Sequence, residues 1–145
     1  MQEPVRIGIL GTGRIVRRWL RDVPPQARIV AIASREETRA VEAAHAYGID
    51  SYCASYEALY ARADVDAVYV AMPNQGHMEN AMAAMRAGKH VLCEKPAGVN
   101  AAQWERMTEC ARKNGVLLME AMWTRCFPAM RRLLAVLAEG KIGTL

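Results

Sequence analysis

Short apolar runs alternate with segments of helical pattern along the whole chain, and this alternation constrains the fold more than any other feature. Most of the apolar runs are continuous, which is typical of strands buried on both faces of a parallel sheet. Strands are predicted over residues 5–10, 27–33, 51–53, 67–71, 90–93 and 116–119, and helices over 14–23, 36–47, 56–61, 74–87, 100–114 and 128–139. We therefore expect an α/β fold, a doubly wound parallel sheet with strand order 3-2-1-4-5-6.

The composition favours a globular protein rather than a membrane or secreted one. The 145 residues suit one domain, and a hydrophobic fraction of 52% suffices for a core. The sequence contains no apolar run of the ~18 residues that a membrane span needs, and its start has no signal-peptide pattern. The cysteines are widely spaced, so we expect reduced thiols, a cytoplasmic location and no metal site. They are Cys53, Cys93, Cys110 and Cys126.

A glycine-rich turn joins the first predicted strand to the first predicted helix. Its residues are Gly11, Thr12, Gly13, Arg14 and Ile15. In a G-x-G-x-x-G fingerprint, the first glycine makes the turn and the second lets the backbone approach a pyrophosphate. Val16 takes the position of the third glycine, which predicts slightly looser helix packing. The turn therefore indicates a dinucleotide site, and an ordinary strand-to-helix turn is the alternative.

The end of the second predicted strand bears on the choice of cofactor. An NAD site commonly has an acidic residue there, whereas this chain has Ser34 and Arg35, with Arg39 one helical turn later. A hydroxyl and guanidinium groups suit a 2′-phosphate, so we expect NADP, with NAD still possible. Glu36 and Glu37 lie close by and weaken this interpretation, and Ser34 with Glu37 also matches a capping box.

Two further groups of polar residues follow the fourth and fifth predicted strands. Pro73, Asn74 and His77 come after the fourth strand, and Glu94 and Lys95 after the fifth. The carboxyl ends of the strands are where open α/β sheets bind ligands. Asn74 could instead be a helix N-cap, His77 an exposed helix residue, and the Glu94–Lys95 segment a surface turn.

Four arginines gather in the first predicted helix, and the net charge of the chain is +4. They form either a solvated helix face or a positive rim beside a phosphate site. They are Arg14, Arg17, Arg18 and Arg21. Neither a recognition helix nor stacking aromatic residues accompany them, so we do not expect nucleic-acid binding.

Four segments together carry a family resemblance that covers nearly the whole chain. They are residues 8–15, 64–70, 88–96 and 119–125. In their order and spacing they resemble the glucose–fructose oxidoreductase, inositol dehydrogenase and MocA family. The third segment, which ends in Glu94-Lys95-Pro96, is the most specific. The last segment is most similar to the branch of dihydrodiol and NADP-dependent xylose dehydrogenases.

The resemblance implies a two-domain oxidoreductase. Residues 1–125 would form a dinucleotide-binding Rossmann domain, and residues 126–145 a connecting helix and the start of a second α/β domain. That domain is absent from this chain; in the family it binds a sugar, polyol or cyclic diol and usually forms the dimer. It also supplies the general acid and base, so we expect these residues alone to be inactive. A non-catalytic nucleotide-binding module or truncated remnant is the alternative function.

The resemblance also implies roles for individual residues. The loop from Gly11 to Ile15 would hold the pyrophosphate, and Ser34 and Arg35 the adenosine ribose or its phosphate. Glu94 is expected on the nicotinamide-side ribose and Lys95 at the reacting carbon, as the catalytic residue. Residues expected along the cofactor or at its nicotinamide end are Pro73, Asn74, His77, Trp123 and Arg125.

Overall fold

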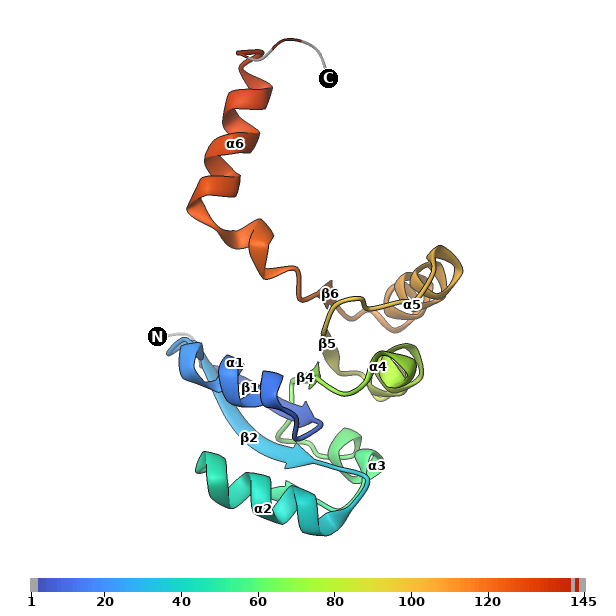
Figure 1. Ribbon diagram of the computed structural model, residues 1–145. Helices are drawn as coiled ribbons and strands as arrows, with labels where there is room; N and C mark the ends of the chain where they lie inside the picture. The colour runs from blue at the N-terminus through green and yellow to red at the C-terminus, as the bar shows by residue number, and fades with distance from the viewer. Residues whose placement is uncertain (1–2, 142, 144–145) are drawn as a thin grey trace.

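The computed structural model describes residues 3–141 and 143, which form a parallel sheet covered by helices (Figure 1). The sheet has six strands in the order β3-β2-β1-β4-β5-β6, which confirms the predicted order and the doubly wound topology. The strands are β1 (Val5–Leu10), β2 (Ala27–Ala33), β3 (Tyr52–Cys53), β4 (Ala67–Val70), β5 (His90–Cys93) and β6 (Leu118–Glu120). Residues 142, 144 and 145, at the end of the segment expected to start a second domain, lie outside the described residues.

Helices cover both faces of the sheet. Helices α1 and α2 lie on one face and α3, α4 and α5 on the other. The helices are α1 (Arg14–Trp19), α2 (Glu37–Tyr47), α3 (Tyr56–Tyr60), α4 (His77–Arg86), α5 (Ala101–Asn114) and α6 (Pro128–Ala138). Three 3-10 turns lie between helices and strands: η1 (Leu20–Asp22) follows α1, η2 (Asn74–Gly76) precedes α4 and η3 (Trp123–Cys126) precedes α6.

Alternating strand residues divide the core into two clusters. On β1, Ile9 faces α1 and α2 whereas Leu10 faces the other helices; on β4, Tyr69 and Val70 are divided in the same way. Val16 of α1 is completely buried in the first cluster. The residue at the third fingerprint position therefore fills the contact between helix and sheet.

The α1 face of the sheet is only partly covered. Among the described residues, no helix packs over β5 and β6 on this face, where Leu92 is half-buried and Met119 is 55% exposed. Helix α6 packs against η3 and extends away from the sheet (Figure 1). This uncovered area borders the candidate site described below.

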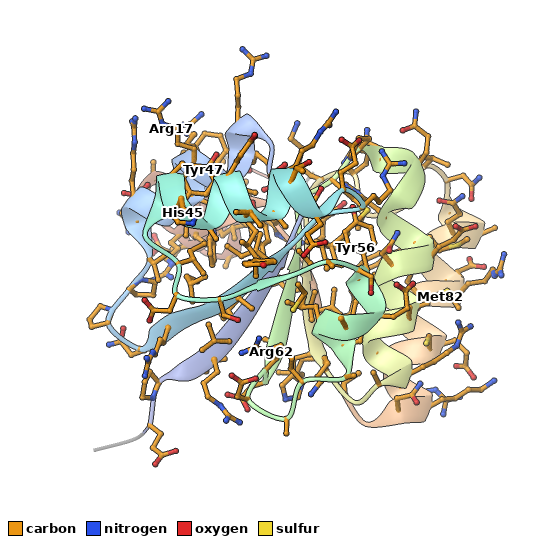
Figure 2. The ribbon with its side chains drawn as sticks, turned by 90° about the horizontal axis from the view of Figure 1, so that it is seen from below. Arg17, His45, Tyr47, Tyr56, Arg62 and Met82 are labelled. Atoms are coloured by element: carbon orange, nitrogen blue, oxygen red, sulfur yellow. The ribbon has the colours of Figure 1, made fainter. Side chains whose placement is uncertain are left out.

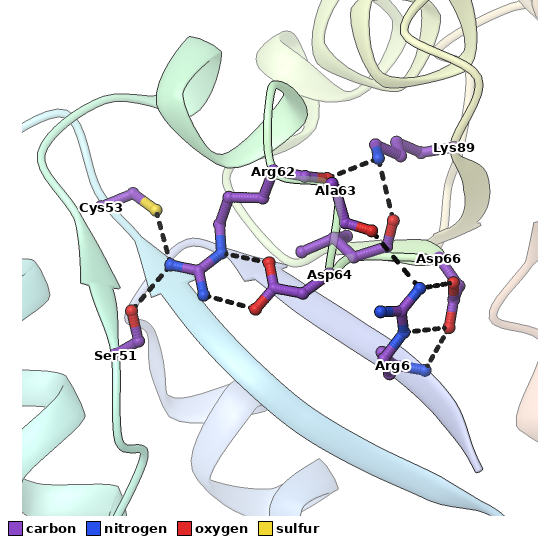
Figure 3. Close-up of polar contacts among 9 residues, drawn as sticks. Arg6, Ser51, Cys53, Arg62, Ala63, Asp64, Asp66 and Lys89 are labelled. Atoms are coloured by element: carbon purple, nitrogen blue, oxygen red, sulfur yellow. Dashed lines mark hydrogen bonds and ion pairs between the residues drawn. The ribbon is translucent and has the colours of Figure 1, made fainter. Parts of the chain in front are cut away.

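A polar network joins the amino ends of the strands, at the edge opposite the candidate site (Figure 3). Arg6 Nη2 donates to Asp66 Oδ1 at 2.6 Å, and the Arg6 main-chain N–H donates to Asp66 Oδ2 at 2.9 Å. Arg62 Nη2 donates to Asp64 Oδ2 at 2.7 Å. Lys89 Nζ donates to the Arg62 carbonyl oxygen at 2.6 Å. The Arg6–Asp66 and Lys89–Arg62 contacts connect segments distant in sequence, which indicates a structural role.

Candidate dinucleotide-binding site

The glycine-rich loop lies at the carboxyl edge of the sheet, between β1 and α1. Gly11 has φ +103°, and a Cβ there would lie 2.4 Å from the Ala71 carbonyl oxygen. Only glycine fits this turn without strain. Gly13 is exposed, and a Cβ there would meet no described atom within 4 Å. The loop is therefore held tightly against the end of β4 on one side and is open on the other.

Three polar residues after β2 have different surroundings: Ser34 is buried, whereas Arg35 and Arg39 are exposed. Ser34 is 7% exposed, and its Oγ accepts a hydrogen bond from the Glu36 amide at 3.4 Å. Glu36, and not Ser34, is the N-cap of α2, so the suggested capping box does not form. Arg39 Nε pairs with Glu36 Oε2 at 2.9 Å. Arg35 is exposed, and its side chain borders a surface hollow.

This hollow has a volume of about 770 Å³ and lies between the end of β2, α3 and the start of α4. Its wall includes Arg35, Tyr56, Met72 and Pro73; Tyr56 is labelled in Figure 2. Tyr56 and Met72 could not be recognised as site residues from the sequence, because neither stands in a motif with an assigned role. Asn74 is exposed in η2 beside the hollow, and η2 has no side-chain cap. The wall combines the Arg35 cation, the Tyr56 ring and apolar side chains with the carboxylates of Glu57 and Glu79.

His77 is placed differently from the sequence expectation of a residue lying along the cofactor. The side chain is completely buried. Its Nδ1 lies 2.9 Å from the Pro96 carbonyl oxygen and its Nε2 2.8 Å from the Met72 carbonyl oxygen. His77 thus joins the loop after β4 to the loop after β5, and its ring is not presented at the surface.

The loop after β5 is fixed by side chains while its lysine stays exposed. Tyr69 Oη donates to Glu94 Oε1 at 2.6 Å, and the Ala97 amide donates to Glu120 Oε1 at 2.9 Å. The peptide bond between Lys95 and Pro96 is cis. Within the described parts of the chain, no carboxylate forms an ion pair with Lys95. Its ammonium group is therefore available to a ligand.

A second hollow of about 480 Å³ lies on the α1 side of Glu94. Its wall is mostly apolar and includes Trp19, Leu92 and Trp123. Arg18 lies over the Trp123 ring, with its guanidinium carbon 5.0 Å from the centroid, which is a cation–π geometry. Trp123 therefore lies beside the end of β5. Arg125 is exposed in η3 but does not line this hollow.

Cys93, which precedes Glu94, has no nucleophilic character. The thiol is buried, and burial, reinforced by Glu120 and Glu94, raises the pKa of Cys93 to about 12. It is therefore protonated at neutral pH. Cys53 and Cys110 are also free and buried, whereas Cys126 is free and exposed. In the part of the chain that the structure describes, no cluster of three metal-ligating side chains occurs, and no helix is both long and apolar enough to span a bilayer.

These features together fit a dinucleotide. The open space above Gly13 is where a Cβ would obstruct an approaching pyrophosphate. The hollow beside Arg35 borders the loops after β2 and β4, and the hollow beside Glu94 borders α1, β5 and η3. Each hollow offers room for one half of a dinucleotide. The fold and the site thus define a Rossmann-type nucleotide-binding domain.

The chain belongs to the Gfo/Idh/MocA family, described as an oxidoreductase family with an NAD-binding Rossmann fold, whose model matches residues 5–122. It is 41% identical over 145 residues to mouse trans-1,2-dihydrobenzene-1,2-diol dehydrogenase. It is 45% identical over 118 residues to the rabbit enzyme of the same name. The crystal structure of KijD10, a 3-ketoreductase from Actinomadura kijaniata in complex with NADP, is also similar, with 40% identity and a TM-score of 0.85.

The chain spans less than half the length of these relatives. The matches cover 97% of this chain but 44% of the mouse enzyme, and 81% of this chain but 36% of the rabbit enzyme. The structural match covers 97% of this chain and 46% of KijD10. The similarity therefore concerns the nucleotide-binding half of these relatives and not their remaining residues.

Proposed function

We propose that this chain is the NADP(H)-binding domain of a dehydrogenase that acts on a sugar, a polyol or a cyclic diol. The observation that carries the proposal is the Gly11–Gly13 loop, fixed at the end of β4 and open above Gly13. It lies at the carboxyl edge of a parallel sheet, in a family described as NAD-binding. The pyrophosphate would bind to the main chain of this loop.

Arg35 would select NADP over NAD. It is the exposed cation bordering the hollow proposed for the adenosine half, where Tyr56 and Pro73 would contact the base. A guanidinium group can bind a phosphate with two parallel hydrogen bonds. Arg39 would contribute less, because Glu36 already pairs with it. The NADP bound to KijD10 supports this assignment.

Lys95 would be the catalytic residue and Glu94 the residue that binds the nicotinamide-side ribose. The cofactor, when bound, supplies a hydride acceptor or donor. The exposed ammonium of Lys95 follows β5, on a loop fixed by His77 and Glu120. A cation at this position would stabilise negative charge that builds on the substrate oxygen during transfer.

Substrate specificity would depend on a further domain. Residues 1–125 would form the nucleotide-binding domain, and residues 126–145 would lead into a second α/β domain that binds the substrate and forms a homodimer. The lengths of the relatives and their diol and keto substrates, as named, support this organisation. The free cysteines support a cytoplasmic location.

A titration with NADPH, followed by nicotinamide fluorescence, tests the proposal. We expect saturable binding to the 145-residue chain. Gly13→Ala is the matched variant, because its added methyl meets no protein atom within 4 Å and yet occupies the space proposed for the pyrophosphate. Its thermal midpoint should equal that of the native chain, with NADPH binding at least about tenfold weaker. Lack of saturation, or equal binding by Gly13→Ala, would contradict the proposal.

A further inference from the structure

Tyr69 is a completely buried residue whose hydroxyl reaches the candidate site, and the proposed function does not use it. Its Oη donates to Glu94 Oε1 at 2.6 Å. This length is typical of a strong hydrogen bond between two oxygen atoms. The contact joins the middle of the sheet to the side chain proposed to bind the nicotinamide-side ribose.

The position of the Tyr69 hydroxyl follows from the strand register. Tyr69 of β4 lies opposite Leu92 of β5, and Glu94 is two residues beyond Leu92. Because side chains alternate along a strand, Glu94 leaves β5 on the same face as Leu92. The phenol ring thus extends toward the carboxyl edge, and the Trp19 ring packs on it with centroids 4.5 Å apart. Packing therefore fixes the hydroxyl independently of Glu94.

Each oxygen of the Glu94 carboxylate has one protein donor. Oε1 accepts from Tyr69, and Oε2 accepts weakly from the Lys95 amide at 3.3 Å. An ionised carboxylate has about four acceptor positions, so it can still accept ligand hydroxyls. Burial, reinforced by the Glu94 carboxylate, raises the pKa of Tyr69. The phenol is therefore a donor throughout the neutral pH range.

We propose that Tyr69 is a positioning residue that holds the Glu94 carboxylate in the orientation that accepts the ribose hydroxyls of the nicotinamide half of the cofactor. The inference rests on the proposed function. The adenosine half would lie in the separate hollow lined by Arg35 and Tyr56. Loss of the Tyr69 hydroxyl should therefore weaken contacts with one half of the dinucleotide and leave the other half unaffected.

Tyr69→Phe removes the hydroxyl and keeps the packed ring. Two probes separate the halves: NADPH carries both, whereas adenosine 2′,5′-bisphosphate lacks the nicotinamide riboside. We expect the variant to bind NADPH about tenfold more weakly, the scale of losing one hydrogen bond to a charged group. Its affinity for adenosine 2′,5′-bisphosphate should stay within about twofold of the native value. Tyr52→Phe, at an exposed tyrosine of β3, is the matched control and should bind both probes normally.

A double-mutant cycle with Glu94→Ala distinguishes positioning from general stabilisation. Glu94→Ala leaves the Tyr69 ring in place. Like Tyr69→Phe, it should weaken the binding of NADPH and leave the affinity for adenosine 2′,5′-bisphosphate nearly unchanged. Adding Tyr69→Phe to it should weaken NADPH binding less than twofold further, because the acceptor is already gone. If the losses of NADPH affinity in the two single variants add up in the double variant, Tyr69 has a structural role only. The same holds if Tyr69→Phe weakens the binding of both probes equally.

The native chain serves as the reference for the proposed function. If it binds both probes and Tyr69→Phe binds NADPH equally well, the positioning role is wrong and the proposed function stands. If the native chain binds neither probe, both proposals fail.

Discussion

Two exposed cations, Arg35 and Lys95, lie in different parts of the candidate site. The proposed function assigns Arg35 to the adenosine half of the cofactor and Lys95 to the reacting half. Among the described residues, neither side chain forms an ion pair with a carboxylate, in contrast to Arg39, which pairs with Glu36. The two residues can therefore be tested separately.

Arg35→Ala should reduce selectivity for NADP. Loss of a charge-assisted contact with the 2′-phosphate should weaken NADPH binding by roughly 10- to 100-fold. NADH affinity should change by less than about twofold, because NADH has no 2′-phosphate. Titrations with both cofactors measure this, with Arg39→Ala as a matched control of smaller expected effect. Equal losses for both cofactors would contradict the role of Arg35.

Lys95→Ala should affect turnover more than cofactor binding. In a polypeptide that also carries the proposed substrate domain, kcat should fall roughly a hundredfold or more, the scale of removing one preorganised electrostatic partner. NADPH affinity should change little, since the pyrophosphate would bind near Gly11. Steady-state kinetics and a binding titration measure the two quantities. Normal turnover, or a loss explained entirely by weaker binding, would exclude the catalytic role.

Residue patterns predicted where polar groups gather but not what each group contacts. The loop at Gly11 and the Glu94–Lys95 pair lie at the expected edge of the sheet. The burial of His77 could not be predicted, because its partners are the carbonyl oxygens of Met72 and Pro96. Carbonyl groups occur at every residue and leave no sequence signal.

At the scale of elements, the ion pair of Asp66 joins the start of β1 to the segment before β4. The Arg6 side chain, and then its main-chain amide, hold the pKa of Asp66 down to about 2 from the ordinary 3.8. Because the pKa is lower in the folded state, this stabilisation is complete above pH 3.8 and is lost as the pH falls toward 2.

Asp66→Asn should therefore destabilise the fold at neutral pH and not in acid. We expect the thermal midpoint at pH 6 to fall by ~2–5 °C, as suits a partly exposed pair. The difference from the native chain should shrink between pH 4 and pH 2. Calorimetric unfolding across this range measures it. An equal difference at both ends of the range would contradict the role of the ion pair.

Element types were easier to predict than their boundaries. The helix predicted over residues 100–114 is α5, and Asn100 caps it: the Asn100 Oδ1 accepts from the Gln103 amide at 2.9 Å. By contrast, β6 begins at Leu118, two residues later than predicted, and α1 ends at Trp19 before a 3-10 turn. A cap has a local chemical signature, whereas an apolar run continues past the point where strand pairing ends.

At the scale of the whole molecule, the sheet order followed from the alternation of strands and helices. The uncovered face over β5 and β6 could not be predicted in this way, since sequence periodicity does not show which surfaces lack a partner. Large apolar side chains are exposed on η3, on α6 and between them: Trp123, Phe127, Leu133 and Leu134. Exposed apolar patches of this kind promote association.

The isolated chain should therefore self-associate at high concentration. Sedimentation velocity across a concentration series should show species larger than the monomer. Replacing Leu133 and Leu134, which are 47% and 55% exposed, by glutamine should shift the distribution toward the monomer. A native chain that stays monomeric at every concentration would contradict this prediction.

A crystal structure of the chain with NADPH bound tests the proposed site most directly. We predict the pyrophosphate on the main chain between Gly11 and Ile15, the 2′-phosphate on Arg35 and a nicotinamide-side ribose hydroxyl on Glu94. The Tyr69 hydroxyl should keep its hydrogen bond to Glu94. A cofactor bound away from the Gly11 loop, or with its nicotinamide half beside Arg35, would contradict the proposed function.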